Sequence, residues 1–349
     1  MTSLHQNYSA LKTDKGIWLR AILLSLIFSL LYLYAASMSP NSIISRQAAF
    51  NVDIPFKYRF LIPCTLDLFL TDKVMDSRLA RTLALMAFLV PCFWLIQRYA
   101  TRIRGTELSP SETATLHASF FLLLLAHYCL PRELNVYYIY DIPAIFFYMT
   151  CFLLLTRTPA KISWYAAALT VLASLNRETV MIAVIHAAAF HLCTEQPRRQ
   201  TIKQTIKKSV WVHLALIAAA IVVTRITINQ LLGASISSNA TPMEGENIRF
   251  WANMERIAHN KHHTTQLLML GCGAILWMPI AFLRFPHKLK WIWAASVPPL
   301  VVFAWAGNIT ELRMYNEFLP CLAVSLWLFL SYQAPQIPRN GGPKHPSNG

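Results

Sequence analysis

Long apolar runs separated by short polar and charged segments make up most of this 349-residue chain. An apolar run of roughly 20 residues crosses the hydrocarbon core of a bilayer as a helix. The pattern therefore predicts an all-α, polytopic integral membrane protein with about ten transmembrane helices. The expected spans are residues 17–37, 80–97, 114–130, 137–156, two within 162–194, 210–228, 265–283, 291–306 and 318–332.

Two segments depart from the simple pattern. Residues 58–70 are too short to span comfortably and contain Pro63 and Asp67, which predicts an interfacial helix after the first span. Residues 162–194 form one apolar block interrupted at Asn176-Arg177-Glu178. This block is either two short spans that meet at a turn or one re-entrant hairpin. Non-helical backbone at membrane depth is tolerated only inside protein or beside a wet cavity.

The composition supports a membrane protein. Hydrophobic residues make up 55% of the chain and charged residues 13%, whereas soluble domains carry about 25% charge. The mean hydropathy is +0.41. We expect a cytoplasmic N-terminal segment over 1–16, a single transmembrane domain over 17–332, and a disordered cytoplasmic tail over 333–349, where Pro and Gly accumulate.

The net charge of +15 indicates orientation and not nucleic-acid binding. Its basic residues fall in short loops between apolar runs, which is the positive-inside pattern. We therefore expect a multi-pass membrane protein with both termini in the cytoplasm, membrane lipids as partners and no nucleic acid. The basic loops are residues 98–112, 157–161, 195–209 and 284–290.

The distinctive charged residues gather on the opposite, outward side. Ionisable groups at membrane depth are costly, so a group of them marks a site by default. We predict that Asp141, Arg177, Glu178 and Arg313 surround one outward-facing cavity, with Arg59 at its rim and Asp53 above it. The candidate site residues are Asp53, Arg59, Asp141, Arg177, Glu178, Glu311, Arg313 and Glu317.

Several of these residues also have a purely structural interpretation. Asp53 is either a general base, a metal ligand or an ordinary loop acid. Arg59 either grips phosphate oxygens with its guanidinium fork or anchors the chain at the interface. Asp141 lies in the first turn of a span, where the helix dipole favours an acid.

The remaining charges also have two interpretations. Arg177 and Glu178 either contact a substrate or hold two helices together through an internal pair, such as Arg177 with Asp141. Arg313 and Glu317 are four residues apart and would pair on one face if an α-helix began this early.

The sequence contains no recognisable metal motif and does not identify a cofactor. His259, His262 and His263 are close in sequence, but no Cys ligand or His-Glu-x-x-His frame accompanies them. No phosphate-binding loop or serine-hydrolase motif occurs in a credible context.

Four short motifs stand out along the chain: Tyr58-Arg59-Phe60-Leu61-Ile62-Pro63, Tyr140-Asp141-Ile142-Pro143-Ala144, Asn176-Arg177-Glu178-Thr179, and Glu311, Arg313, Glu317 and Pro320. They resemble those of a group of bacterial polytopic membrane proteins, and their layout is similar to the GT-C class of membrane glycosyltransferases. Enzymes of this class use polyprenyl-phosphate-linked sugars and keep a catalytic acid in the first outward loop. The resemblance implies a multi-pass protein of the bacterial inner (cytoplasmic) membrane, with Asp53 as the catalytic base and Arg59, Arg177 or Arg313 holding the lipid phosphate. The first loop has a single Asp where many members have an acidic pair.

The function expected from this resemblance is transfer of a sugar from a polyprenyl-phosphate donor to an envelope acceptor on the periplasmic side. The alternatives are a transporter or flippase for a lipid-linked or anionic solute, with the same charges as its binding site, and a structural membrane subunit, in which the charges only pair with each other.

Overall fold

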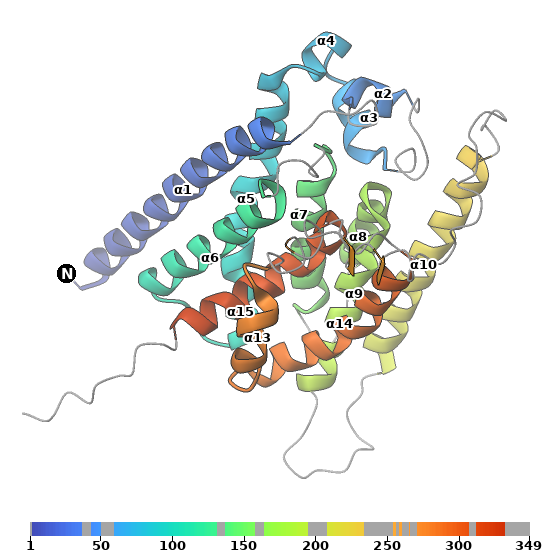
Figure 1. Ribbon diagram of the computed structural model, residues 1–349. Helices are drawn as coiled ribbons and strands as arrows, with labels where there is room; N and C mark the ends of the chain where they lie inside the picture. The colour runs from blue at the N-terminus through green and yellow to red at the C-terminus, as the bar shows by residue number, and fades with distance from the viewer. Residues whose placement is uncertain are drawn as a thin grey trace, which may run out of the picture.

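The computed structural model describes most of the apolar part of the chain (Figure 1). Throughout the described ranges the chain forms helices and turns, and it has no strand there, so the predicted all-α class is confirmed. The described residues are 2–36, 43–49, 59–130, 137–157, 164–194, 208–233, 254–255, 258–259, 265, 271–306 and 312–331.

The elements follow the chain in a simple order from one apolar segment to the next. They are α1 (Thr2–Ala35), α2 (Ile44–Ala48), α3 (Leu61–Asp67), α4 (Asp72–Met75), α5 (Arg78–Arg104), α6 (Pro110–Tyr128), α7 (Asp141–Leu155), α8 (Trp164–Asn176), the 3₁₀ helix η4 (Glu178–Val180), α9 (Met181–Thr194), α10 (Lys208–Gly233), α13 (Ala274–Phe282), α14 (His287–Ala306), the 3₁₀ helix η5 (Leu312–Phe318) and α15 (Leu319–Ser331).

The long apolar helices fit a membrane protein. Among the described residues, three helical stretches are long and apolar enough to cross a membrane: Gly16–Ala35, Arg78–Arg104 and Val210–Leu231. Large apolar side chains such as Leu19 and Val223 are exposed along them. Exposed apolar surface of this extent is rare on soluble monomers and suits lipid. Other apolar helices are shorter, so helix length does not establish the expected count of about ten spans.

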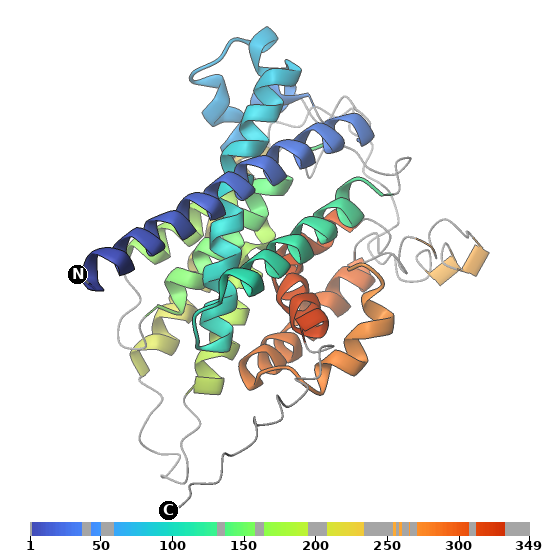
Figure 2. The ribbon, with the colours of Figure 1, turned by 90° about the vertical axis from the view of Figure 1, so that its left-hand side faces the viewer.

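Helix α7 occupies the centre of the bundle. It packs against α5, α8, α9 and η5, while α1 crosses the outside of α5 and α6 (Figures 1 and 2). The sequence of α7 explains this position, because a helix that is hydrophobic on all sides is covered on all sides. Asp141, its first residue, is the one charged side chain in the helix and is buried with it.

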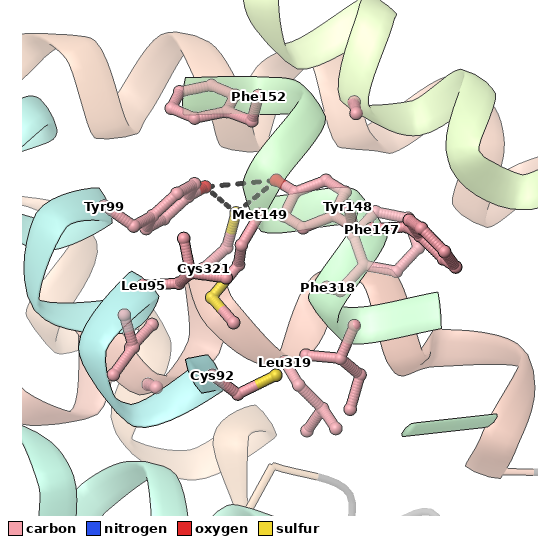
Figure 3. Packing of buried hydrophobic residues seen from close by; sticks show 14 of the residues in the cluster. Cys92, Leu95, Tyr99, Phe147, Tyr148, Met149, Phe152, Phe318, Leu319 and Cys321 are labelled. Atoms are coloured by element: carbon pink, nitrogen blue, oxygen red, sulfur yellow. Dashed lines mark hydrogen bonds between the residues drawn. The ribbon is translucent and has the colours of Figure 1, made fainter. Parts of the chain in front are cut away.

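A chain of polar side chains links five helices inside this apolar core, and Figure 3 shows three of its members, Tyr99, Tyr148 and Cys321. Tyr99 Oη of α5 lies 3.1 Å from Tyr148 Oη of α7 and 2.8 Å from Cys321 Sγ of α15. His186 of α9 continues the chain, with Nδ1 2.6 Å from Tyr148 Oη and Nε2 2.9 Å from Ser296 Oγ of α14. Because Ser296 donates its proton to a backbone carbonyl, it accepts from His186 Nε2, and His186 Nδ1 accepts from Tyr148.

The expected basic loop after the second span is partly helix. Helix α5 continues to Arg104, so Arg98, Arg102 and Arg104 lie on its last two turns and not in a loop. Arginine is a good helix former, and cations are favoured at a helix C-terminus. The helix ends at Gly105, which adopts φ +85°, a left-handed conformation that glycine accepts because it has no Cβ.

Two other boundaries test the sequence pattern. The predicted interruption of residues 162–194 is confirmed, because Arg177 is extended (φ −159°, ψ 133°) between α8 and η4.

The predicted single span over 265–283 is wrong in its described part. A turn over 271–273 precedes α13, with positive φ at Gly271, Cys272 and Gly273. The two glycines adopt this conformation without the steric cost that a Cβ brings.

Candidate functional site

A buried ionic cluster lies where several helices begin or end. Arg177 Nη1 is 3.4 Å from Asp141 Oδ1, and Arg177 Nε is 3.8 Å from Glu317 Oε1. The side chains are only 5%, 1% and 1% exposed for the arginine, the aspartate and the glutamate. One cation thus faces two carboxylates in a nearly solvent-free setting, where an unpaired charge costs several kcal/mol.

Local structure explains how these three charges meet. Asp141 opens α7, and the helix N-terminus favours its charge. Arg177 occupies the extended break after α8, which frees its side chain from the helical register. Glu317 lies near the end of η5, just before α15 begins. Each residue therefore comes from a terminus or a break, although the three are far apart in sequence.

Neighbouring polar side chains form hydrogen bonds around the starts of α7 and α15. Thr179 donates a short hydrogen bond to Glu317 Oε1. Asn316 Nδ2 donates to the carbonyl oxygen of Asp141 at 3.4 Å. Asn176 Nδ2 donates to the carbonyl oxygen of Tyr140 at 3.1 Å. These contacts hold the starts of α7 and α15 against the break at Arg177.

A second group of charges lies beside the first and is more exposed. Glu178 accepts from Arg59 Nη2 at 3.0 Å and from Arg225 Nη2 at 2.7 Å. The Glu178 side chain is 45% exposed, whereas each arginine is 13% exposed. Arg59 also donates to Tyr140 Oη at 3.3 Å, with its guanidinium 5.0 Å from the Tyr140 ring centroid. Burial alone would lower the pKa of Arg59, but the charges of and hydrogen bonds to Glu178 and Tyr140 together outweigh burial, and the pKa is raised.

The two groups carry opposite net charges. The inner group has one cation, Arg177, against Asp141 and Glu317. The outer group has two cations, Arg59 and Arg225, against one carboxylate, Glu178. The whole cluster is balanced, with excess negative charge inside and excess positive charge at its exposed edge.

Several buried polar atoms near the cluster retain unused hydrogen-bonding capacity. In the described part of the chain, those without a hydrogen-bond partner include Tyr128 Oη, Tyr137 Oη, Asn176 Oδ1, Asn316 Oδ1 and Glu317 Oε2. Tyr128 and Tyr137 interact electrostatically with Asp141, which places both near the inner group. Buried polar atoms without partners are rare in native proteins and mark positions where water or a ligand binds.

The structure brings together five of the residues predicted from the sequence: Arg59, Asp141, Arg177, Glu178 and Glu317. Asp141, Arg177 and Glu317 pack against each other and are buried. Arg59 is in direct contact with Glu178, whose side chain is more exposed.

The three other predicted residues are Asp53, Glu311 and Arg313, and the structure describes the backbone of one of them. Asp53 and Glu311 lie outside the described residues. Arg313 belongs to η5, which is a 3₁₀ helix and not the α-helix on which the expected pairing with Glu317 depended.

The sequence analysis missed Arg225, although a signal for it was present. Arg225 lies inside the apolar run expected to span at 210–228, and an arginine within such a run marks a functional or paired position by default. Its partner, Glu178, was already a candidate. In the described part of the chain, no three His, Cys, Asp or Glu side chains are grouped so as to hold a metal ion.

Comparison of the chain with protein-family models, curated proteins and solved structures gave no match.

Proposed function

We propose that the protein is a membrane-embedded glycosyltransferase that moves a sugar from a polyprenyl-phosphate donor to an envelope acceptor on the periplasmic side. The observation that carries the proposal is the ionic cluster next to an apolar cavity. A lipid-linked sugar has a phosphate and a sugar joined to a long apolar chain, so its site needs both surfaces side by side.

The 3₁₀ helix η5 separates the two surfaces. Tyr315 and Phe318 are three residues apart, so they share one face of η5, and both line an apolar cavity of about 370 Å³. Asn316 and Glu317 lie between them in sequence and contact the cluster through Asp141 and Arg177. The other walls of the cavity are Ala274, Met278 and Phe282 of α13, Trp293, Ala294, Val297 and Leu300 of α14, and Leu322 of α15.

This cavity suits an isoprenoid chain. Its wall includes Val297, which is 55% exposed on the outer surface of α14, so the cavity borders an apolar face. Met278 adds a flexible, polarisable side chain that adapts to an irregular apolar ligand. The tail of the donor would lie here, with its phosphate directed past η5 toward the arginines.

The outer group supplies the charge that a departing phosphate requires. Arg59 and Arg225 share one half-exposed carboxylate, which leaves excess positive charge at the edge of the cluster. Arg59 Nε has no hydrogen-bond partner among the described residues. Fixed cations that face developing negative charge are a major source of rate acceleration.

The reaction balances without a redox step. A base removes the proton of the acceptor hydroxyl as its oxygen bonds to the sugar carbon, and the bond from that carbon to the phosphate oxygen breaks. Polyprenyl phosphate leaves with the electron pair. We assign the base role to Asp53, from the family resemblance, and the phosphate contacts to Arg59 and Arg225.

The test is transfer of sugar from a synthetic polyprenyl-phosphate donor by membranes that contain the full chain. We expect Asp53→Asn, Arg59→Gln and Arg225→Gln each to lower transfer by at least about a hundredfold while the protein still folds. Arg104→Gln is the matched control, because it removes an arginine charge from the C-terminal end of α5, outside the ionic cluster. Full transfer by Asp53→Asn would remove its role as base, and full transfer by both arginine variants would remove the phosphate site.

One observation favours a structural subunit as the second candidate. Three arginines and three carboxylates already pair with one another, which is sufficient to hold the helices together. A structural role predicts that the same variants lose folding and not a separable activity. A flippase would instead move the lipid-linked sugar across proteoliposomes without transferring it to an acceptor.

A further inference from the structure

A second cavity lies at the opposite end of α7 from Asp141, about 20 Å further along the helix axis. Its volume is about 740 Å³, within the range of ligand-binding sites. It is formed by the last turns of α5 and α7 and the first turn of α14. The lining residues are Trp94, Leu95, Arg98, Thr101, Arg102, Gly105, Glu107, Thr150, Leu153, Leu154, Arg157 and Lys288.

The lining carries more positive than negative charge. Four cations line the cavity against one acid, Glu107. Glu107 lies 3.8 Å from Arg98, and both side chains are at least half exposed. Arg102, Arg157 and Lys288 form no ion pair with any acid in the described part of the chain. Three cations therefore converge on the cavity without a carboxylate.

Two of these cations contact the same aromatic ring, that of Phe190. Arg102 Cζ lies 5.4 Å and Lys288 Nζ 4.9 Å from the centroid of this ring on α9. Cation–π contact attracts each cation but does not cancel the repulsion between them. Arg102 Nε and Thr101 Oγ1 are buried and have no hydrogen-bond partner among the described residues. An anion with several acceptor oxygens would satisfy these groups together.

We propose that this cavity binds the phosphate headgroup of an anionic phospholipid. The phosphate would contact Arg102, Arg157 and Lys288, and the acyl chains would follow the apolar wall. Basic pockets between transmembrane helices recognise anionic headgroups in this way.

The apolar wall favours a lipid over a soluble phosphate ester. Trp94, Leu95, Leu153 and Leu154 line one side of the cavity, and Trp94 is 39% exposed at its edge. A small phosphate ester would leave these side chains uncovered, whereas acyl chains would cover them. This site is separate from the ionic cluster and does not depend on the proposed transferase activity.

The test is native mass spectrometry of the detergent-solubilised full chain, titrated with phosphatidylglycerol or phosphatidylcholine of matched acyl chains. We expect the wild-type protein to retain phosphatidylglycerol at least tenfold more strongly than phosphatidylcholine. The double variant Arg102→Gln/Lys288→Gln should bind phosphatidylglycerol about thirty-fold more weakly, since each cation near a headgroup contributes about fivefold.

The matched control is Arg104→Gln/Lys290→Gln, which removes two cations from the same helices outside the cavity. Arg104 pairs instead with Glu112, and Lys290 donates to the carbonyl of Leu283. If the double cavity variant does not fold, Lys288→Gln against Lys290→Gln supplies the same comparison, with an expected loss of about fivefold.

Three results would overturn the proposal. The first is equal retention of the two phospholipids by the wild-type protein. The second is an equal loss of binding in the cavity variant and its control. The third is displacement of bound lipid by millimolar inorganic phosphate from a site that shows no acyl-chain dependence, which would indicate a soluble phosphate ligand.

Discussion

Replacing Arg177 with methionine should destabilise the protein more than replacing any other arginine of the cluster. The change keeps the apolar stem of the side chain but removes the cation between Asp141 and Glu317. Two buried carboxylates would then face each other without a counter-charge. Breaking a buried ion pair by removing one partner costs about 3–5 kcal/mol.

The geometry supports a loss at the upper end of this range. At the observed distances of 3.4 and 3.8 Å, each attraction amounts to about 4–5 kcal/mol at an effective dielectric constant of about 20. The cost of burying the charges offsets much of this gain in the wild-type protein. Removing Arg177 forfeits the attraction while the cost of burying Asp141 and Glu317 remains.

The assay is reversible unfolding of the purified protein in mixed micelles, followed by helical circular dichroism. Arg225→Met is the matched control. Its partner Glu178 is 45% exposed and also pairs with Arg59, so we expect a loss below about 1 kcal/mol. The triple variant Arg177→Met/Asp141→Asn/Glu317→Gln removes all three charges and should recover most of the stability, because no uncompensated charge remains.

Two outcomes would contradict this account of the cluster. Arg177→Met could prove no more destabilising than Arg225→Met, which would mean that water reaches the inner carboxylates. The triple variant could prove as unstable as Arg177→Met alone, which would mean that the hydrogen bonds, and not the charges, hold the helix ends together.

Further substitutions at three places test other parts of the fold by the same unfolding assay. Tyr148→Phe removes the central hydroxyl of the buried polar chain and should lower the free energy of unfolding by about 1–3 kcal/mol. Tyr128→Phe removes a hydroxyl without a hydrogen-bond partner among the described residues and should lower it by less than about 0.5 kcal/mol. Equal losses of stability in the two variants would contradict the hydrogen-bond assignments. Gly271→Ala places a Cβ on a residue with φ +60° and should cost about 1–2 kcal/mol; an unchanged stability would mean that the turn relaxes. Ser109→Ala removes the side-chain cap of α6 and should cost about 1 kcal/mol. The hydrogen bond from the Ser109 backbone N–H holds the pKa of Glu112 below its usual value. The stability that the Glu112 carboxylate contributes is therefore present at neutral pH and is lost as the pH falls through the lowered pKa. Glu112→Gln should abolish this loss of stability in acid.

The apolar pattern predicted most helices because burial and lipid contact both select apolar side chains. The expected spans at 114–130 and 210–228 correspond to α6 and α10, with ends that differ by two to five residues. The expected span at 17–37 corresponds to α1, but α1 begins fifteen residues earlier, at Thr2. The helix ends were harder to predict, because a polar residue such as Arg104 fits the last turn of a helix as well as it fits the loop that follows. The turn at Gly271 was missed because its glycines are embedded in apolar sequence, and hydropathy does not register backbone conformation.

The candidate site was predictable as a set of residues but not as a set of pairs. A charge in an apolar run signals that it needs a partner, and this reasoning selected Asp141, Arg177 and Glu178. It does not say which partner, because pairing depends on how helices distant in sequence pack. Glu178 adjoins Arg177 in sequence, yet it pairs with Arg59 and Arg225. The extended backbone at Arg177 lets the two neighbours point to different groups.

The position of the cluster follows from what a helix end offers a charge. In the middle of an apolar helix the backbone groups are already paired, and a charged side chain finds only other side chains. At a terminus, free backbone groups and the helix dipole contribute as well. Asp141 begins α7, Arg177 lies between α8 and η4, and Glu317 precedes α15. A chain that breaks its helices at one end of the bundle can therefore build a buried polar site there at lower cost than one that inserts the same charges mid-helix.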